Sequence, residues 1–429
     1  MTARLTAAGL LVRTLRDGSY SHLALDSALS ASGLSAQDRA LCTQLYYGVI
    51  RRMLTLRHIV SCYSKRPPER LDVQVLCILY LGLYQLLYCD GIPDRAAVHE
   101  SVALTRDMHK GSAAGFVNAV LRSFLRDDKR IRLPQDETAA MSVRWSVPEA
   151  LVRVLLAEKG PDFTEAFLAD ALKVPPCTVR RNPLRCPPQA LEALGAAPCR
   201  RVEGAYLLPV QDPAGTPEFR QGFYHVQDTA SQLCCAVLDP QPGETVLDMC
   251  AAPGGKTFTI AERMEDRGQV YAFDLHEKRV RLIEEGAARL GLACIRAGVQ
   301  DASVYRADLP LADRVLCDVP CSGLGVIRRK PEIRYKPLES FARLPEVQRG
   351  ILETACRYVR PGGTLVYSTC TVVRSENEAV VEDFLAAHPE FEPEMLTELG
   401  IDAAWHTFSP AEDCDGFFAA RMRRKAGAS

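Results

Sequence analysis

The strongest constraint on the fold is an alternation of short apolar runs with helical segments over residues 231–429. Continuous apolar runs are typical of parallel strands that are covered on both faces. Between two of these runs, a helix predicted over 277–290 ends at Gly291 and carries apolar residues on one face: Val280, Ile283, Ala287 and Leu290. The alternation predicts an α/β fold with a doubly wound, Rossmann-like sheet in strand order 3-2-1-4-5. Strands are predicted over 245–248, 270–273, 293–295, 315–317 and 365–367.

A chain of 429 residues is too long for one compact core, so three domains are predicted. Residues 1–133 lack strand alternation and are expected to form an all-α domain. Prolines and short apolar runs over 140–230 predict a small mixed α/β module, and residues 231–429 carry the parallel sheet. Helices of the first domain are expected over 40–53, 72–88, 96–108 and 113–125.

The composition limits the classes of partner. With a formal net charge of -1, a polyanion would have to meet local basic patches. Sixteen cysteines occur without a Cys-x-x-Cys pair, so neither a metal site nor a disulfide framework is predicted, and a cytoplasmic location is expected. The apolar run over 73–89 is interrupted by Gln74 and Gln85, which favours a buried helix over a membrane span.

A glycine-containing loop connects the first predicted strand to the next helix. Glycines allow a ligand to approach the backbone closely, and the start of a helix offers free amide donors. Cys250 stands where a phosphate-binding P-loop needs glycine, and adjacent glycines do not make a dinucleotide fingerprint. We therefore expect a cofactor site without a phosphate motif, formed by Cys250, Ala251, Ala252, Pro253, Gly254, Gly255 and Lys256.

Two acidic residues after the next strands suit the recognition of an adenosine. Asp274 ends the second predicted strand, where a carboxylate can bind the two hydroxyls of a ribose. The alternative is a capping pair of Asp274 with Glu277 for the following helix. Asp301, after the third strand, can accept a hydrogen bond from an adenine amino group, and the alternative is a solvated loop acid.

Two cysteines follow directly on neighbouring strands of the predicted sheet. Cys321 lies three residues after Asp318 at the end of the fourth strand, and Cys370 follows the fifth. These side chains are expected to converge with the glycine loop at one carboxyl edge. Two thiols there suit an enzyme that attacks an electron-poor ring and then removes a proton from it, although spacing does not separate the two roles. For other cysteines we expect the ordinary role of burial: Cys234, Cys235, Cys294, Cys317 and Cys356.

Three motifs resemble those of S-adenosylmethionine-dependent RNA cytosine-C5 methyltransferases. They are LDMCAAPGGKT over 247–257, DVPCSGLGVIRR over 318–329 and STCT over 368–371. The stretches FVNAVLR over 116–122 and HVQDTAS over 225–231 further resemble the bacterial RsmB (Sun/Fmu) branch, which carries a NusB-type helical domain and modifies 16S ribosomal RNA. The resemblance covers nearly the whole chain, with one departure at Tyr335, where tryptophan is expected.

This resemblance implies a cytosine-C5 methyltransferase that acts on 16S ribosomal RNA with S-adenosylmethionine as methyl donor and without a metal. It implies Cys370 as the nucleophile that adds to C6 and Cys321 as the residue that promotes proton removal and product release. Asp318 is suited to contact cytosine N3 and also to line the cofactor site.

Several short clusters of basic residues along the chain indicate an RNA-binding face, and Arg328 and Arg329 are expected to contact phosphate. A monomer is expected. Two other classes stay open: a non-catalytic RNA-binding factor, which the cysteine pair disfavours, and a nucleotide-dependent oxidoreductase, which the missing fingerprint disfavours. Residues 375–378 (SENE) are interpreted as a helix capping box.

Overall fold

The computed structural model describes residues 2–17, 22–210 and 212–427. The chain divides into two compact units: Met1–Leu172 with Lys330–Lys336, and Lys173–Arg329 with Pro337–Ser429. Among the described helices, none combines the length and the apolar character that a bilayer span requires.

The first unit is all-helical, as predicted. Its central helix is α5 (Val73–Tyr88), which contains no charged residue and is buried without a break from Val75 to Leu86. Such a helix has to be surrounded on all sides, and five others pack against it: α1 (Ala3–Asp17), α3 (Ala36–Arg51), α4 (Met53–Tyr63), α6 (Asp94–Asp107) and α7 (Ala114–Arg126). The unit also contains α2 (His22–Ala31).

The first unit extends beyond the expected boundary near residue 133. Residues 137–170 form α8 (Glu137–Trp145) and α9 (Glu149–Asp170), so the start of the expected α/β module is helical and belongs to this unit. The prolines that suggested irregular structure mark helix starts instead: Pro148 precedes α9, and Pro161 follows a break at Gly160.

The short segment Lys330–Lys336 also belongs to the first unit although its neighbours in sequence belong to the second. The Tyr335 hydroxyl donates to the carbonyl of Ile50 at 2.5 Å, and the Arg334 guanidinium donates to the carbonyl of Ala171 at 2.8 Å. Tyr335, the departure from the family motif, thus has a structural partner in the helical core.

The second unit begins with a small antiparallel sheet in the order β2-β3-β1-β4. Its strands are β1 (Thr178–Arg181), β2 (Ala197–Pro198), β3 (Ala205–Leu207) and β4 (Tyr224–Val226), with the short helices α10 (Pro188–Glu192) and α11 (Pro217–Arg220). This part is the small mixed α/β module expected from the sequence.

The large sheet has the order β10-β12-β9-β8-β5-β6-β7, with β11 paired to β12. The strands β5 (Thr245–Asp248), β6 (Gln269–Asp274), β7 (Ile295–Val299), β8 (Ala312–Asp318) and β9 (Val359–Thr369) are mutually parallel. In chain order they form the predicted 3-2-1-4-5 arrangement. Antiparallel β10 (Phe391–Pro393), β11 (Trp405–Phe408) and β12 (Phe417–Arg424) extend the sheet beyond the prediction.

The third parallel strand was wrongly placed over 293–295. It begins at Ile295 because the Asp266 carboxylate accepts hydrogen bonds from the backbone N–H groups of Ala293 and Cys294.

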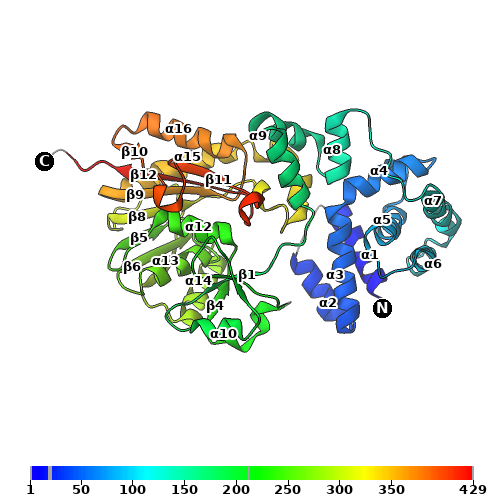
Figure 1. The fold of residues 1–429 in the computed structure, drawn as a ribbon, viewed down its shortest axis with the longest axis horizontal. Helices are drawn as coiled ribbons and strands as arrows, with labels where there is room; N and C mark the ends of the chain where they lie inside the picture. The colour runs from blue at the N-terminus through cyan, green and yellow to red at the C-terminus, as the bar shows by residue number, and fades with distance from the viewer. Residues whose placement is uncertain (1, 18–21, 211, 428–429) are drawn as a thin grey trace. The chain divides into compact units, whose positions relative to one another are not determined.

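Helices cover both faces of the large sheet, as a doubly wound fold requires (Figure 1). On one face lie α12 (Thr229–Leu238), α13 (Gly255–Arg263) and α14 (Glu277–Leu290), and the core between them and the sheet contains Val246. On the other face lie α15 (Leu344–Ala355) and α16 (Glu378–Ala387), and the core there contains Leu247. The bounds of α14, its buried face and its end at Gly291 are as predicted.

Candidate active site

The carboxyl ends of the parallel strands surround a cavity of about 590 Å³. Seven of the residues predicted for the site line it: Cys250, Ala252, Asp274, Asp301, Asp318, Cys321 and Cys370. A neighbouring cavity of about 240 Å³ shares Asp318 and is lined by the rest of the glycine loop except Gly254: Ala251, Pro253, Gly255 and Lys256. The convergence expected from the strand order is therefore present.

The two thiols of the site are in direct contact. The Sγ atoms of Cys321 and Cys370 lie 3.2 Å apart, and the Cys370 backbone N–H donates to the Cys321 sulfur at 3.3 Å. The hydrogen bond with Cys370 and burial raise the pKa of the Cys321 thiol well above its usual value. Cys321 therefore holds its proton firmly, and its thiolate would be a strong proton acceptor.

Asp318 is held by a cation and a hydroxyl. The Lys256 ammonium donates to its carboxylate at 2.7 Å, and the Ser368 hydroxyl donates to its other oxygen at 3.0 Å. Burial is the largest single effect and would lower the pKa of Lys256, but the charge and hydrogen bond of Asp318, together with Cys234 and Cys235, outweigh burial and raise it above its usual value. Lys256 is thus a protonated group within the site, and its ammonium also lies 5.0 Å from the Phe417 ring centroid.

The glycine loop turns sharply into α13. Gly254 has φ +112°, and a Cβ at this position would lie 2.3 Å from the Phe258 ring, so glycine is required both for conformation and for space. The Ala251 backbone N–H donates to the Phe273 carbonyl at 2.7 Å, which ties the loop to the end of β6.

Asp274 and Asp301 lie on the cavity wall in different surroundings. Asp274 is almost fully buried, accepts from the His276 backbone N–H at 3.0 Å and pairs with Arg279 at 3.0 Å. It forms no capping pair with Glu277, which instead pairs with Arg281. Hydrogen bonds from the Ser303 hydroxyl and backbone lower the pKa of Asp301.

Two further polar residues of this region were not singled out from the sequence. Gln300, buried on the cavity wall, has a side-chain oxygen without a hydrogen-bond partner among the described residues. Asp248, fully buried at the end of β5, accepts from the Thr257 hydroxyl at 2.7 Å. Burial raises the pKa of Asp248 to about 7. A buried acceptor and an almost fully buried carboxylate on one cavity wall fit a ligand that carries amino and hydroxyl donors, such as an adenosine.

The loop that carries Cys321 is anchored by a buried carboxylate. Glu376 accepts from the Ser322 backbone N–H at 2.8 Å and from the Gln348 amide at 2.9 Å, and the same amide donates to the Pro320 carbonyl at 3.0 Å. The interpretation of residues 375–378 as a capping box is wrong, because α16 begins at Glu378 without a side-chain cap. The Asn377 amide instead donates to the Thr371 carbonyl at 3.1 Å, beside Cys370.

Arg328 and Arg329, which the sequence suggests as phosphate contacts, form internal ion pairs in the structure. Arg328 is buried and donates to Asp415 at 2.7 Å and 3.0 Å. Arg329 bonds to Asp415 and to Asp228. Both guanidinium groups therefore hold the 321–329 loop to distant segments of the same unit.

A doubly wound sheet of this order, with a glycine loop after its first strand and an acid at the end of its second, defines a Rossmann-like S-adenosylmethionine-dependent methyltransferase. The comparisons with known proteins agree. The family 16S rRNA methyltransferase RsmB/F matches residues 235–423, and the NusB family matches residues 1–126.

Similar proteins extend over nearly the whole chain. The probable ribosomal RNA small subunit methyltransferase B of Bacillus subtilis is 38% identical over 97% of both chains. The ribosomal RNA small subunit methyltransferase B of Vibrio cholerae is 33% identical over 99% of this chain and 98% of that one. Among solved structures, PH0851 is 25% identical with a TM-score of 0.79 and covers 99% of both chains. The chain therefore belongs to the RsmB/F family of 16S ribosomal RNA methyltransferases.

Proposed function

We propose that this protein methylates C5 of a cytosine in 16S ribosomal RNA through a transient bond between Cys370 and C6 of the base. The observation that carries the proposal is the 3.2 Å contact between the sulfur atoms of Cys321 and Cys370, which line the same cavity as Asp318. A monomeric enzyme that acts in the cytoplasm is part of the proposal.

The chemistry explains why two thiols are needed. Cytosine C5 is a poor nucleophile, and addition of the Cys370 thiolate to C6 converts the C5–C6 bond into an enamine that can accept a methyl group. S-adenosylmethionine, when bound, supplies that methyl group as a sulfonium electrophile. Once deprotonated, the Cys321 sulfur accepts the proton of C5 as a thiolate. The electrons of the C5–H bond restore the C5–C6 double bond, and the Cys370–C6 bond breaks with its electron pair leaving on the Cys370 sulfur.

Asp318 and Lys256 suit the opposite edge of the base. Negative charge develops at N3 when the thiolate adds to C6, so a proton donor is needed there. The carboxylate of Asp318 can accept from the exocyclic amine and pass a proton to N3, and the Lys256 ammonium at 2.7 Å is the adjacent source of that proton. The target base must leave its stack to reach these groups.

The methyl donor would be held by the glycine loop and the two cavity acids. Asp274 would bind ribose hydroxyls and Asp301 the adenine amino group, which their position on the cavity wall supports, and Gln300 offers a further buried acceptor there. Asp318, at the junction of the two cavities, would lie near the methionine part of the donor.

The test compares two single substitutions on transcribed 16S RNA, with bisulfite sequencing of the product. Cys370→Ser should abolish methylation without a covalent adduct, because no sulfur adds to C6. Cys321→Ala should accumulate a protein–RNA complex that survives a denaturing gel, because the C5 proton is not removed. The reverse pattern would overturn the assignment of the two roles, and the absence of an adduct from both variants would overturn the covalent mechanism.

A further inference from the structure

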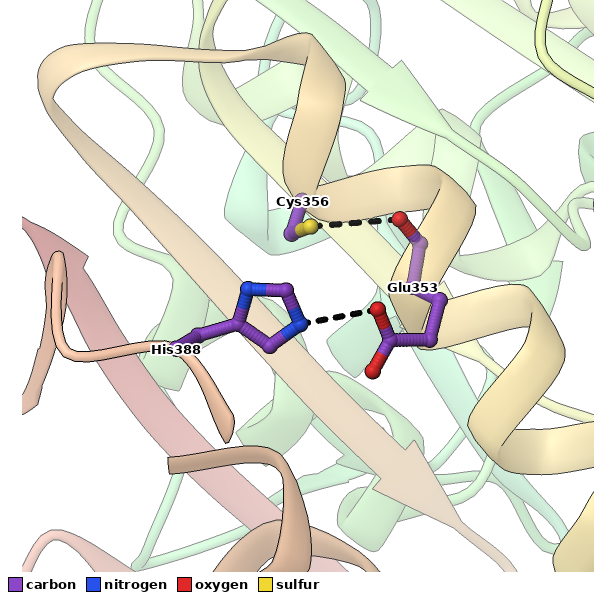
Figure 2. Close-up of side chains that lie close together, drawn as sticks. All are labelled: Glu353, Cys356 and His388. Atoms are coloured by element: carbon purple, nitrogen blue, oxygen red, sulfur yellow. Dashed lines mark hydrogen bonds and ion pairs between the residues drawn. The ribbon is translucent and has the colours of Figure 1, made fainter. Parts of the chain in front are cut away.

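A second cluster of reactive side chains lies away from the active-site cavity, at the carboxyl end of α15. Glu353 is in the last turn of α15, Cys356 follows in the next turn, and His388 follows α16 (Figure 2). One donor atom from each residue, the carboxylate oxygen, the thiol sulfur and an imidazole nitrogen, lies within 4.8 Å of the other two. Across the described ranges, this is the single group of three or more such side chains at that spacing.

The His388 ring is fixed in orientation by its neighbours. Its Nδ1 lies 3.0 Å from Glu390 Oε1, its Nε2 lies 2.8 Å from Glu353 Oε2, and the ring stacks on Phe384 with centroids 4.5 Å apart. A carboxylate that accepts the Nδ1 proton leaves the Nε2 lone pair directed at Glu353. Two lone pairs cannot face each other at this distance, so either a proton lies between the two atoms or both atoms turn toward a shared metal ion.

We propose that Glu353, Cys356 and His388 form a zinc site, with Glu390 as the carboxylate that orients the histidine. Thiolate, imidazole and carboxylate are the ligand types that zinc combines, at distances of about 2.0–2.3 Å. Donor atoms within 4.8 Å of one another require only small side-chain movements to meet one ion. The carboxyl end of α15 adds the negative end of its helix dipole, which favours a cation.

The Cys356 thiol has an ordinary partner without metal, since it donates to the Glu353 carbonyl at 3.2 Å (Figure 2). Zinc binding would break this hydrogen bond and release the thiol proton, so that the sulfur binds as thiolate. The thiol is nearly buried, whereas the His388 side chain is 19% exposed and that of Glu353 is 51% exposed, so an ion has a path from solvent through the carboxylate.

A metal at this position would link α15 to the segment after α16. The same helix carries Gln348, which holds the Cys321 loop, and Ile351, which lines the active-site cavity. The proposed ion would therefore stabilise a helix that supports the active site, and the inference does not depend on the reaction proposed above.

The competing explanation is a protonated His388 between two carboxylates, with Cys356 as a plain buried thiol. Both explanations use the same contacts, so the test must measure metal directly. Full-length protein stripped with EDTA is titrated with zinc against a chromophoric chelator, stoichiometry is measured by native mass spectrometry, and cobalt(II) is added to a second sample for thiolate-to-metal absorption.

Wild type should bind one zinc ion, and cobalt should give a thiolate charge-transfer band. Cys356→Ser and His388→Gln should each weaken zinc binding by at least about a hundredfold and remove that band, and Glu390→Gln should weaken binding about ten- to hundredfold. Zinc should raise the melting temperature of wild type and not that of His388→Gln. The His388 variant keeps the measurement interpretable where Cys356→Ser fails to fold.

The matched control is Cys62→Ser in the helical unit, where the sulfur lies 3.5 Å from His58 Nε2 and the described residues supply no third ligand at that spacing. This variant should bind zinc as wild type does. The proposal is overturned if wild type binds no zinc, if His388→Gln binds it equally well, or if Cys370→Ser and not His388→Gln removes it.

Discussion

The sulfur atoms of Cys321 and Cys370 are 3.2 Å apart although 49 residues separate them in the chain. The contact follows from the sheet, because β8 and β9 are parallel neighbours and both cysteines lie just beyond their carboxyl ends. The two cysteine loops are also joined by a hydrogen bond, which the Ser322 hydroxyl donates to the Thr371 hydroxyl at 2.9 Å. The relative position of the two thiols therefore depends on residues that take no part in bond formation, and these can be tested separately.

Glu376 is such a positioning residue. Glu376→Gln keeps the side-chain shape but replaces one acceptor oxygen by a donor, and the carboxamide binds the Ser322 backbone N–H more weakly than a carboxylate. We expect a loss of stability of about 1–3 kcal/mol and a slower release step, seen as partial accumulation of the covalent RNA adduct on a denaturing gel. Glu382→Gln, which alters only an exposed pair with Arg374, is the control. A variant that loses stability but turns over without adduct would show that Glu376 acts on folding alone.

The buried carboxyl group of Asp248 should make the stability of the protein depend on pH. Burial raises its pKa to about 7, above the unfolded value, so the folded protein holds a proton that the unfolded chain has released. Its contribution is fully present below the unfolded pKa of about 3.9 and is lost as pH rises through about 7. The free energy of unfolding should fall with pH in this window by up to about 1.4 kcal/mol per pH unit from this group.

Asp248→Asn isolates this effect, because the amide oxygen can still accept from Thr257 but does not titrate. Urea unfolding of both proteins between pH 5 and 8, without added S-adenosylmethionine, should give a difference that grows in favour of the variant as pH rises. A constant difference across this range would contradict the raised pKa.

Arg328 should matter for stability and not for RNA affinity. Arg328→Ala removes one of the two arginines that pair with the buried Asp415 and leaves the pair with Arg329. Removing one member of a buried ion pair costs about 3–5 kcal/mol, and the remaining arginine favours the lower end of that range. Urea unfolding measures the loss, and Arg374→Ala, in an exposed pair, should cost less than about 1 kcal/mol. A folded Arg328 variant with a reduced salt dependence of RNA binding would restore the phosphate contact that the sequence suggested.

The parts of the fold that depend on local pattern could be predicted from the sequence. The continuous apolar runs at 245–248 and 315–317 and the amphipathic helix at 277–290 are parts of the sheet core and of α14, and their order places the cysteine loops together. The antiparallel strands β10, β11 and β12 were missed, because an edge extension leaves no regular alternation with helices.

Residues whose role depends on a distant partner could not be predicted. Whether Arg328 is an exposed or a buried cation depends on its ion pair with Asp415, which is 87 residues away in the sequence. Glu376 lies at a spacing that also suits a capping box, and only the fold brings Ser322 to its carboxylate. The same holds for Cys356, which sequence alone assigns to the core and the structure brings to His388.

A close backbone approach at Gly325 gives a further test of the geometry of the two cysteine loops. The Gly325 backbone N–H donates to the Cys370 carbonyl at 3.0 Å, and its own carbonyl accepts from the Gly416 N–H at 3.0 Å. A Cβ at Gly325 would lie 2.0 Å from the Gly416 carbonyl oxygen and 2.8 Å from that of Cys370, so Gly325→Ala must push the two cysteine loops apart. A displacement of about 1 Å in a reacting group can cost about a hundredfold in rate, and we expect a loss of kcat of that order.

The measurement is methyl transfer to 16S RNA at saturating donor, with the melting temperature recorded alongside. Gly350→Ala in α15 is the matched control, because a Cβ there meets nothing within 4 Å and alanine favours the helix. Full activity in Gly325→Ala would mean that the spacing of the two sulfur atoms does not limit the reaction.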